Sequence, residues 1–262
     1  MTNIVVLVKQ VPDTYSERKL SGSDYTLDRE SADAVLDEIN ERAVEEALKI
    51  KEAGEGEVTV LAVGPARATD AIRKALSMGA DKAIHVTDEA LHGSDLLATA
   101  KVIAAAIRKV EGVDLVIAGN EASDGRGGAV PAIVAELLGF PQLTHARQLT
   151  VEGTTVKVDR ETGDEGLTHL EASLPALISV TEKINEPRYP SFKGIMAAKK
   201  KPVETFSVAD LGIDAGEVGL GNAWSTVVEA APKPPRTAGQ RVEDEGDGGT
   251  KVAEYLVGQK LI

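Results

Sequence analysis

The sequence of 262 residues contains no cysteine. This absence excludes disulfides, thiolate metal sites, iron–sulfur ligation by cysteine and cysteine nucleophiles. Aromatic residues make up only 3% of the chain, so the core must consist mainly of Val, Ile, Leu and Ala. The net charge of −13 argues against general nucleic-acid binding, because that activity needs a basic surface.

Long hydrophobic runs are also absent. No segment approaches the roughly eighteen apolar residues that span a bilayer, and the N-terminus has no basic region followed by a cleavable apolar stretch. We therefore expect a protein of the cytoplasm with no direct membrane insertion.

Motifs of catalysis are missing as well. None of the four histidines, His85, His92, His145 and His169, has a histidine partner at helical spacing, so we expect no metal site. The chain has no Gly-x-x-x-x-Gly-Lys-Ser/Thr loop and no Gly-x-Ser-x-Gly elbow. We predict no catalytic residues, and a packed, hydrogen-bonded role for His85.

Strand and helix patterns alternate through the first 140 residues. Continuous apolar runs typical of strands buried on both faces occupy Asn3–Val11, Glu57–Gly64, Lys82–Thr87 and Asp114–Gly119. Helical spacing occupies Asp37–Ala53, Ala66–Met78, Ser94–Val110 (with Ser94 as its expected cap) and Gly127–Leu138. This alternation predicts an α/β fold with a doubly wound, mainly parallel sheet. A small hairpin is expected at residues 18–30.

The pattern changes after Pro141. Alternating segments at Arg147–Val151, Thr155–Arg160 and Leu167–Ala172 predict added antiparallel strands, and Leu174–Thr181 predicts another buried strand. We expect residues 1–201 to form one nucleotide-binding domain. Residues 202–262 contain a proline cluster and an acidic glycine run before a last helical pattern, and are either an extended arm or a disordered tail.

A ligand site is expected beyond the carboxyl ends of the strands, where open α/β sheets bind ligands. The loops concerned are Val8–Pro12, Ala62–Pro65 and Gly119–Val130. The third loop is rich in glycine and opens a helix, which suits a phosphate, but glycines also serve simply in a tight turn. Asp124 would bind a ribose hydroxyl or cap the helix.

Residues 187–201 form a proline-braced, cationic segment in an acidic chain. It carries Phe192 and Met196 ahead of Lys199, Lys200 and Lys201. One interpretation is a stiff loop that presents an apolar residue beside positive charge to a partner. The other is a loop whose apolar residues fold back into the core, with the lysines in solvent.

Three blocks together resemble the β subunits of electron transfer flavoproteins over essentially the whole chain. The first joins Val158–Glu161, with the acidic-glycine stretch to Gly166, to Leu174–Ile178; the second joins Asn185–Tyr189 to Gly194–Lys201; the third is Asp114–Asp124 with the glycines after it. The short, aromatic-poor form is similar to actinobacterial members.

The resemblance implies an adenine nucleotide α-hydrolase-like sheet and an αβ heterodimer that carries one FAD, held mainly by the α subunit, and one AMP inside the β subunit. Bifurcating relatives bind a second FAD in place of the AMP, and the Gly125–Gly128 loop favours AMP. Matched residue by residue, the implied cofactor-binding positions are Leu7, Asp37, Asn40, Val63, Gly119, Asn120, Asp124, Gly125, Arg126, Gly127, Gly128, Ala129 and Val130. Two loops depart from the family pattern, Asp37–Ile39 and Asp124–Gly128.

The resemblance also implies partners. Phe192, Ile195, Met196, Lys199 and Lys200 match the segment that recognises acyl-CoA dehydrogenases. Glu161 matches a glutamate that contacts the α subunit and governs the motion of the flavin domain. The tail would embrace the α subunit, and the heterodimer would pass electrons on to a membrane quinone oxidoreductase.

Two alternatives use the same sheet. One is a stand-alone ATP-binding stress-type module or adenylating protein, which would place a lysine or serine after the glycines; here Ala129, Val130 and Pro131 follow. The other is a scaffold without a bound nucleotide, which the nucleotide content of the denatured protein would distinguish.

Overall fold

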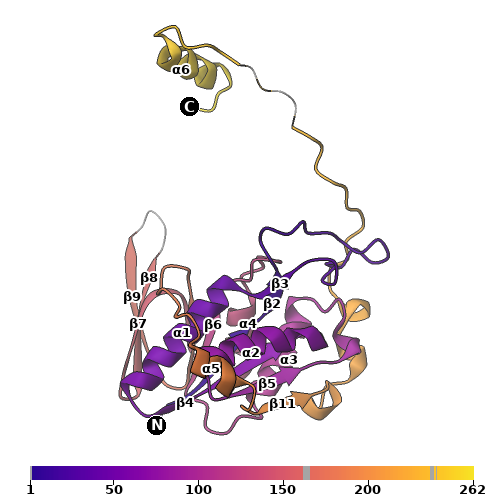
Figure 1. Ribbon diagram of the computed structural model, residues 1–262, viewed down its shortest axis with the longest axis vertical. Helices are drawn as coiled ribbons and strands as arrows, with labels where there is room; N and C mark the ends of the chain where they lie inside the picture. Colours follow the sequence, from indigo (N-terminus) through magenta and orange to yellow (C-terminus); the bar gives the residue numbers. More distant parts are fainter. Residues whose placement is uncertain (1, 162–165, 237–238, 240) are drawn as a thin grey trace. The chain divides into compact units, whose positions relative to one another are not determined.

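The computed structural model describes residues 2–161, 166–236, 239 and 241–262. The chain forms two compact units, Met1–Val227 and Val228–Ile262. Within the first unit lies a nine-stranded sheet in the order β11-β5-β4-β1-β6-β10-β7-β8-β9 (Figure 1). Its strands are β1 Thr2–Val8, β4 Gly56–Val63, β5 Lys82–Val86, β6 Leu115–Gly119, β7 Gln142–Glu152, β8 Thr155–Glu161, β9 Leu167–Ser173, β10 Ala176–Val180 and β11 Val203–Phe206.

Seven strands, from β11 to β7, are parallel, and β8 and β9 extend the sheet in antiparallel fashion. The predicted doubly wound sheet with added antiparallel strands is therefore confirmed. A two-stranded sheet of β2 (Gln10–Pro12) and β3 (Ala34–Leu36) lies outside it. The expected hairpin at 18–30 consists of a turn closed by one bridge between Leu20 and Leu27.

Helices cover both faces of the sheet. They are α1 Glu38–Ala53, α2 Thr69–Met78, α3 Leu96–Ile107, α4 Val130–Leu138 and α5 Phe192–Ala198, with short 3₁₀ turns η1 Ala66–Ala68, η2 Glu89–Leu91, η4 Ala209–Leu211, η5 Ala215–Glu217 and η6 Leu220–Asn222. Ile4 and Val6 of β1 pack in one core cluster with α1 and α2, whereas Val5 packs in the other with α3 and α4. This alternation along a buried strand places one layer of helices on each face.

Several predicted details are wrong. Asp95, not Ser94, caps α3, since its Oδ1 accepts from Ala98 N at 2.9 Å. Helix α4 begins at Val130 rather than Gly127, and Ala129 occupies its cap position, so Asp124 does not cap it. Residues 192–198 form helix α5 instead of the predicted stiff loop.

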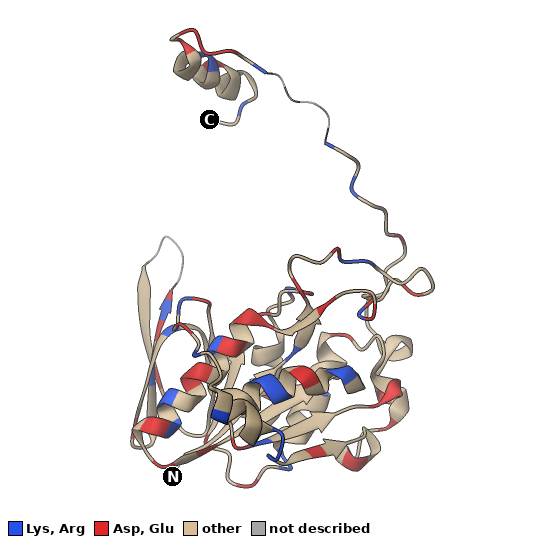
Figure 2. Ribbon diagram, in the orientation of Figure 1, with Lys and Arg blue, Asp and Glu red and all other residues tan. Residues whose placement is uncertain are grey.

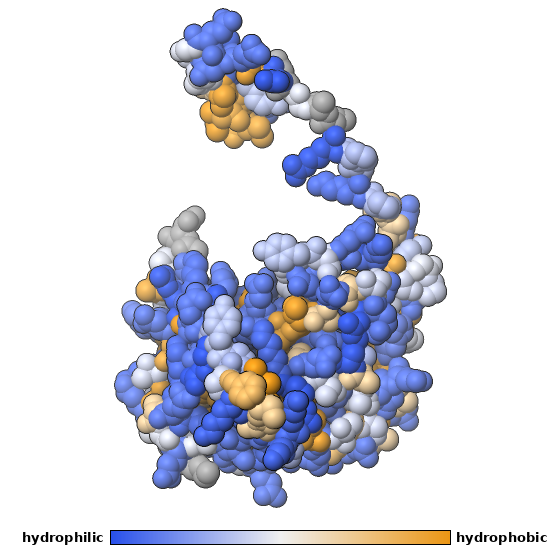
Figure 3. Space-filling model, viewed as in Figure 1, coloured by the Kyte–Doolittle hydropathy of each residue, from blue (hydrophilic) through white to orange (hydrophobic). Residues whose placement is uncertain are grey.

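The end of the chain differs in part from the expected arm. β11 follows residue 202 and pairs with β5, so the first unit continues to Val227 past the predicted boundary at 201. The second unit carries α6, Gly248–Gly258. Apolar side chains gather on one side of this helix (Figure 3). Among the described residues, no helix is long and apolar enough to cross a membrane.

Candidate functional site

The strand order reverses at β1, which has β4 on one side and β6 on the other. Helix α1 follows β1 on one face, and α4 follows β6 on the opposite face. The chains leaving β1 and β6 therefore diverge at the carboxyl edge of the sheet, at the place where open α/β sheets hold their ligand crevice. Two of the three predicted loops, Val8–Pro12 and Gly119–Val130, meet at this crevice.

Asp37 ties helix α1 to the glycine-rich loop. Its Oδ1 accepts from Ile39 N at 3.0 Å and from Asn40 N at 3.2 Å, and its Oδ2 accepts from Ser123 N at 2.8 Å. The carboxylate is buried at 1% exposure, so these three donors supply the hydrogen bonds that a buried charge requires. The first turn of α1 and the loop after β6 are thereby held together.

Asp124 lies at the centre of a small charged cluster. Its Oδ1 lies 2.9 Å from Lys9 Nζ and its Oδ2 lies 2.9 Å from Arg29 Nη2, while its side chain is only 2% exposed. Burial acts against the charged form, but the charges of Lys9 and Arg29 outweigh it and hold the pKa of Asp124 below its usual range. The carboxylate for which a ribose contact was predicted therefore already has two cationic partners within the chain, Lys9 and Arg29.

The Asn120 side chain leaves a polar atom without a partner. Asn120 directly follows β6, and its backbone N donates to Val180 O at 2.9 Å. Its Oδ1 is buried, and no hydrogen bond to it is found within the described part of the chain. A buried carbonyl oxygen without a donor is costly, so this atom indicates a hydrogen-bond donor supplied from outside the chain.

The glycines of this loop differ in whether the surrounding structure requires a glycine at their position. A Cβ on Gly127 would lie 2.8 Å from Cδ2 of Leu96, an exposed side chain that can turn away, whereas the φ of +63° at Gly128 favours glycine there. A Cβ on Gly125 would have no atom within 4 Å, and its φ is unexceptional. The tight-turn interpretation therefore explains Gly128 and leaves Gly125 without a reason inside the chain.

The remaining predicted cofactor positions are divided between core and surface. Leu7 packs in the core on the α3–α4 side, Val63 is partly buried at the end of β4, and Asn40 is buried in the first turn of α1. Gly119 is buried, Ala129 and Val130 are partly buried, and the residues from Gly125 to Gly128, with Arg126, are exposed. The structure thus brings Asp37, Asn40, Asn120 and Asp124 to one edge. Lys9 and Arg29 were missed; Lys9 lies in a loop that the sequence marked, but Arg29 had no sequence signal.

His85 has the packed role that was predicted. It is 3% exposed on β5, and its Nε2 lies 3.1 Å from Gly64 O. Burial lowers its pKa, which favours the neutral ring. Within the described ranges, no group of three or more His, Asp or Glu side chains is arranged to hold a metal ion.

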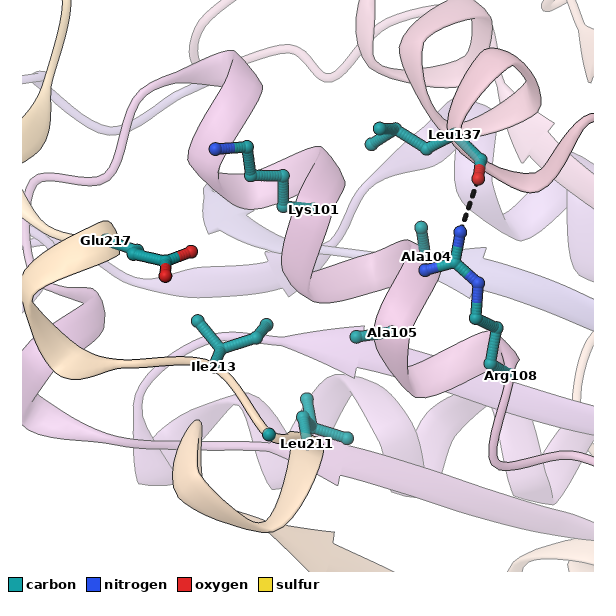
Figure 4. A pocket seen from close by; sticks show the side chains of 9 residues that line it. Lys101, Ala104, Ala105, Arg108, Leu137, Leu211, Ile213 and Glu217 are labelled. Atoms are coloured by element: carbon teal, nitrogen blue, oxygen red, sulfur yellow. Dashed lines mark hydrogen bonds between the residues drawn. The ribbon is translucent and has the colours of Figure 1, made fainter.

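A shallow pocket of about 250 Å³ lies away from the crevice, beside α3 and α4 (Figure 4). Lys101 and Arg108 line it together with Leu211, Ile213 and Glu217, and Arg108 donates to Leu137 O. Its polar groups are exposed or already paired, so we regard the crevice rather than this pocket as the candidate ligand site.

Helix α5 carries the predicted docking residues. Ser191 caps it through Oγ, which accepts from Gly194 N at 3.0 Å. Phe192 is 80% exposed, Ile195 and Met196 are about half exposed, and Lys199 and Lys200 are exposed. The interpretation in which Phe192 and Met196 fold back into the core is therefore wrong. Of the three lysines after α5, Lys201 differs from Lys199 and Lys200 because it is not free in solvent. Its Nζ donates to Leu76 O at 3.0 Å and to Ala80 O at 2.5 Å, near the end of α2.

Glu161 ends β8 and already has partners. Its two oxygens each lie 2.9 Å from Lys183 Nζ, and Arg147 Nη1 lies 3.9 Å from Oε1. The hydrogen bonds from Lys183 lower the pKa of Glu161, so this side chain stays anionic. Residues 162–165 of the acidic-glycine stretch lie outside the described residues.

These features define a doubly wound α/β protein with a polar crevice at the switch in strand order and an exposed apolar helix. The model of the electron transfer flavoprotein domain matches residues 24–211. The chain is 64% identical to the electron transfer flavoprotein subunit beta of Mycobacterium tuberculosis, strain H37Rv, and 62% identical to that of Mycobacterium leprae, in both cases over 100% of both chains. It is 38% identical to the caffeyl-CoA reductase-Etf complex subunit CarD of Acetobacterium woodii over 90% of this chain and 89% of the relative.

The chain therefore belongs to the electron transfer flavoprotein family, and within it to the β subunits. It is an electron carrier subunit rather than an enzyme. The mycobacterial relatives agree with the expected likeness to actinobacterial members.

Proposed function

We propose that the chain pairs with an electron transfer flavoprotein α subunit, and that this heterodimer takes electrons from acyl-CoA dehydrogenases and passes them to a membrane quinone oxidoreductase. The observation that carries the docking part is Phe192, 80% exposed at the start of a helix. We expect the heterodimer to act in the cytoplasm. Family membership decides against a stand-alone ATP-binding stress-type or adenylating protein.

Helix α5 supplies the docking surface in this proposal. An apolar patch lies over α5 on a mostly hydrophilic face (Figure 3). Phe192, Ile195 and Met196 would enter a pocket of the dehydrogenase, since large apolar side chains dominate binding energy at protein interfaces. Lys199 and Lys200 would attract an acidic partner and raise the rate of encounter.

The crevice would hold AMP. The unpartnered Oδ1 of Asn120 calls for a donor such as an adenine amino group or a ribose hydroxyl, and the open space beside Gly125 suits a phosphate close to the backbone. Lys9 and Arg29 supply nearby positive charge. A second FAD in this position, as in bifurcating relatives, is the alternative.

FAD would be shared with the α subunit and would accept and pass on the electrons. Glu161 is our candidate for the contact that biases the position of the flavin domain. Because its carboxylate binds Lys183 in this chain, a cationic group of the α subunit would have to displace or join that lysine.

The C-terminal unit is proposed to bind the α subunit. Val252, Tyr255 and Val257 of α6 are all more than half exposed, which is unusual for apolar residues of one short helix. A helix with an apolar side needs a surface to cover it, and the α subunit would supply one.

Electron transfer from an acyl-CoA dehydrogenase to the heterodimer tests this proposal. With the Phe192→Ala heterodimer as electron acceptor, the dehydrogenase should show a KM for the heterodimer that is about tenfold higher, because the variant lacks the main apolar contact. Leu20→Ala is the control, since Leu20 is another exposed apolar residue, outside α5. Equal KM values for the wild-type and Phe192→Ala heterodimers would contradict docking through α5.

A further inference from the structure

The segment before α5 is fastened to helix α1 by one arginine. Arg188 Nε and Nη2 donate to the two oxygens of Glu45 at 2.8 and 3.0 Å. Its Nη1 and Nη2 donate to the two oxygens of Glu52 at 2.5 and 2.9 Å. The backbone N of Arg188 also donates to Glu45 Oε2, at 3.1 Å. The planar guanidinium thus forms paired hydrogen bonds with two carboxylates of α1 at the same time. A lysine ammonium does not reproduce this geometry.

Glu45 makes this clamp necessary to the local structure. Its side chain is only 7% exposed, whereas that of Glu52 is 55% exposed. A buried carboxylate is tolerated when it is paired and hydrogen-bonded, and Arg188 supplies those partners. The charged side chains of α1 are seen in Figure 2, where acidic and basic residues alternate along the helix. The salt bridge between Arg188 and Glu45 therefore fixes the chain four residues before Phe192.

The other end of α5 is fastened to α2. Arg73 Nη1 donates to Ala198 O at 2.7 Å and to Lys201 O at 3.0 Å. In the middle of the helix, Gly194 lies directly against Ser77 O, and a Cβ there would collide with that oxygen. Helix α5 is thus held at its beginning, its middle and its end.

Between these fixed points, the apolar side chains stay exposed. Tyr189 is 96% exposed and Phe192 is 80% exposed, with Pro190 stiffening the chain between them. A surface that is fixed before binding loses less conformational freedom when its partner arrives, and so binds more tightly.

We propose that Arg188 is a positioning residue for docking. It does not contact the dehydrogenase; by clamping the chain to Glu45 and Glu52, it holds Phe192 in the orientation that the partner's pocket requires. The inference rests on the proposed docking function of α5.

The test compares variants of the αβ heterodimer as electron acceptors for an acyl-CoA dehydrogenase reduced by its acyl-CoA. The principal variant, Glu45→Gln with Arg188→Met, removes the clamp without leaving a buried charge unpaired. Glu52→Gln removes the exposed half alone, and Arg188→Lys keeps the charge without the paired geometry. The control is Lys157→Met on β8, which removes an exposed ion pair with Glu152 of β7.

We expect the double variant to raise the KM for the heterodimer about tenfold, with kcat and FAD content unchanged. Arg188→Lys should raise KM by an intermediate factor, and Lys157→Met should leave it unchanged. Amides of residues 189–198 should exchange with deuterium faster in the double variant, because the segment has lost one anchor.

Unchanged KM in the double variant would overturn the inference. If Phe192→Ala raises KM while the double variant does not, docking stands and the positioning role fails. If neither variant raises KM, docking through α5 fails as well, and the positioning role fails with it.

Discussion

Asp37 Oδ2 accepts a hydrogen bond from Ser123 N at 2.8 Å, although the two residues are 86 positions apart in the sequence. The same carboxylate caps α1 through Ile39 N and Asn40 N. One buried side chain therefore sets both the start of a helix and the path of the loop after β6. We therefore expect the loop after β6 to move relative to α1 when this bond is removed.

Asp37→Ala should destabilise the first unit by about 2–3 kcal/mol, because it removes a helix cap and a hydrogen bond between distant segments. Thermal denaturation measures the change. Asp247→Ala is the matched control, since Asp247 occupies the cap position of α6 without a side-chain capping bond. The loss of a similar amount of stability in both variants would contradict the special role of Asp37.

Asp124 predicts a particular dependence of stability on pH. Because its pKa is lowered from 3.8 in the folded chain, its pairing with Lys9 and Arg29 contributes stability above about pH 3.8, which is lost as the pH falls further. Asp124→Asn should cost about 1–3 kcal/mol at pH 7, discounted for the partial exposure of both cations, and should flatten the acid side of the stability curve. Denaturant unfolding between pH 3 and 7 measures both effects, and parallel curves for wild type and variant would argue against the prediction.

Gly194 permits the close approach of α5 to α2. Gly194→Ala should destabilise the chain by about 1–2 kcal/mol net, because the collision with Ser77 O exceeds the gain in helix propensity. Gly221→Ala, where an added Cβ meets no atom within 4 Å, should change stability by less than about 0.5 kcal/mol. Both values come from denaturant unfolding of the first unit, and a tolerated Gly194→Ala would show that α5 has room to move.

Glu161 and Lys183 predict opposite effects on electron transfer. If Glu161 pairs with the α subunit in the productive arrangement, Lys183→Met frees the carboxylate and should raise the rate, whereas Glu161→Gln should lower it. Stopped-flow reduction of the heterodimer at several salt concentrations measures both rates. The same direction of change in both variants would rule out this competition.

Much of the fold follows from patterns that are local in sequence. Continuous apolar runs predicted the buried parallel strands, and alternating runs after Pro141 predicted β7 to β9, because each pattern reports which strand faces are buried. The carboxyl edge of the strands and the glycine-rich loop before a helix could also be anticipated from the sequence, whereas the strand order came from the structure. The specific residues of the family resemblance predicted the identity.

What escaped prediction depends on contacts between distant segments. The sequence around Arg29 does not indicate that its side chain pairs with Asp124. Lys201 cannot be distinguished in the sequence from the two lysines before it, because its difference depends on a hydrogen bond to a carbonyl of α2. Ser94 and Asp95 are both good capping residues, so the sequence does not determine which of them occupies the N-cap position of α3; in the structure it is Asp95. Helix α5 is only seven residues long and needs its anchors on α1 and α2, so its sequence resembled a loop.

The nucleotide content of the heterodimer tests the account most directly. The chain should be co-expressed with an electron transfer flavoprotein α subunit, purified, and denatured in acid to release its ligands for chromatography, with Gly125→Ala prepared in parallel. The account predicts one FAD and one AMP per heterodimer, and loss of AMP from Gly125→Ala with little change in stability, because the added Cβ would occupy space kept for a phosphate. Two FAD per heterodimer, no adenine nucleotide besides FAD, or ATP on the isolated chain would contradict it.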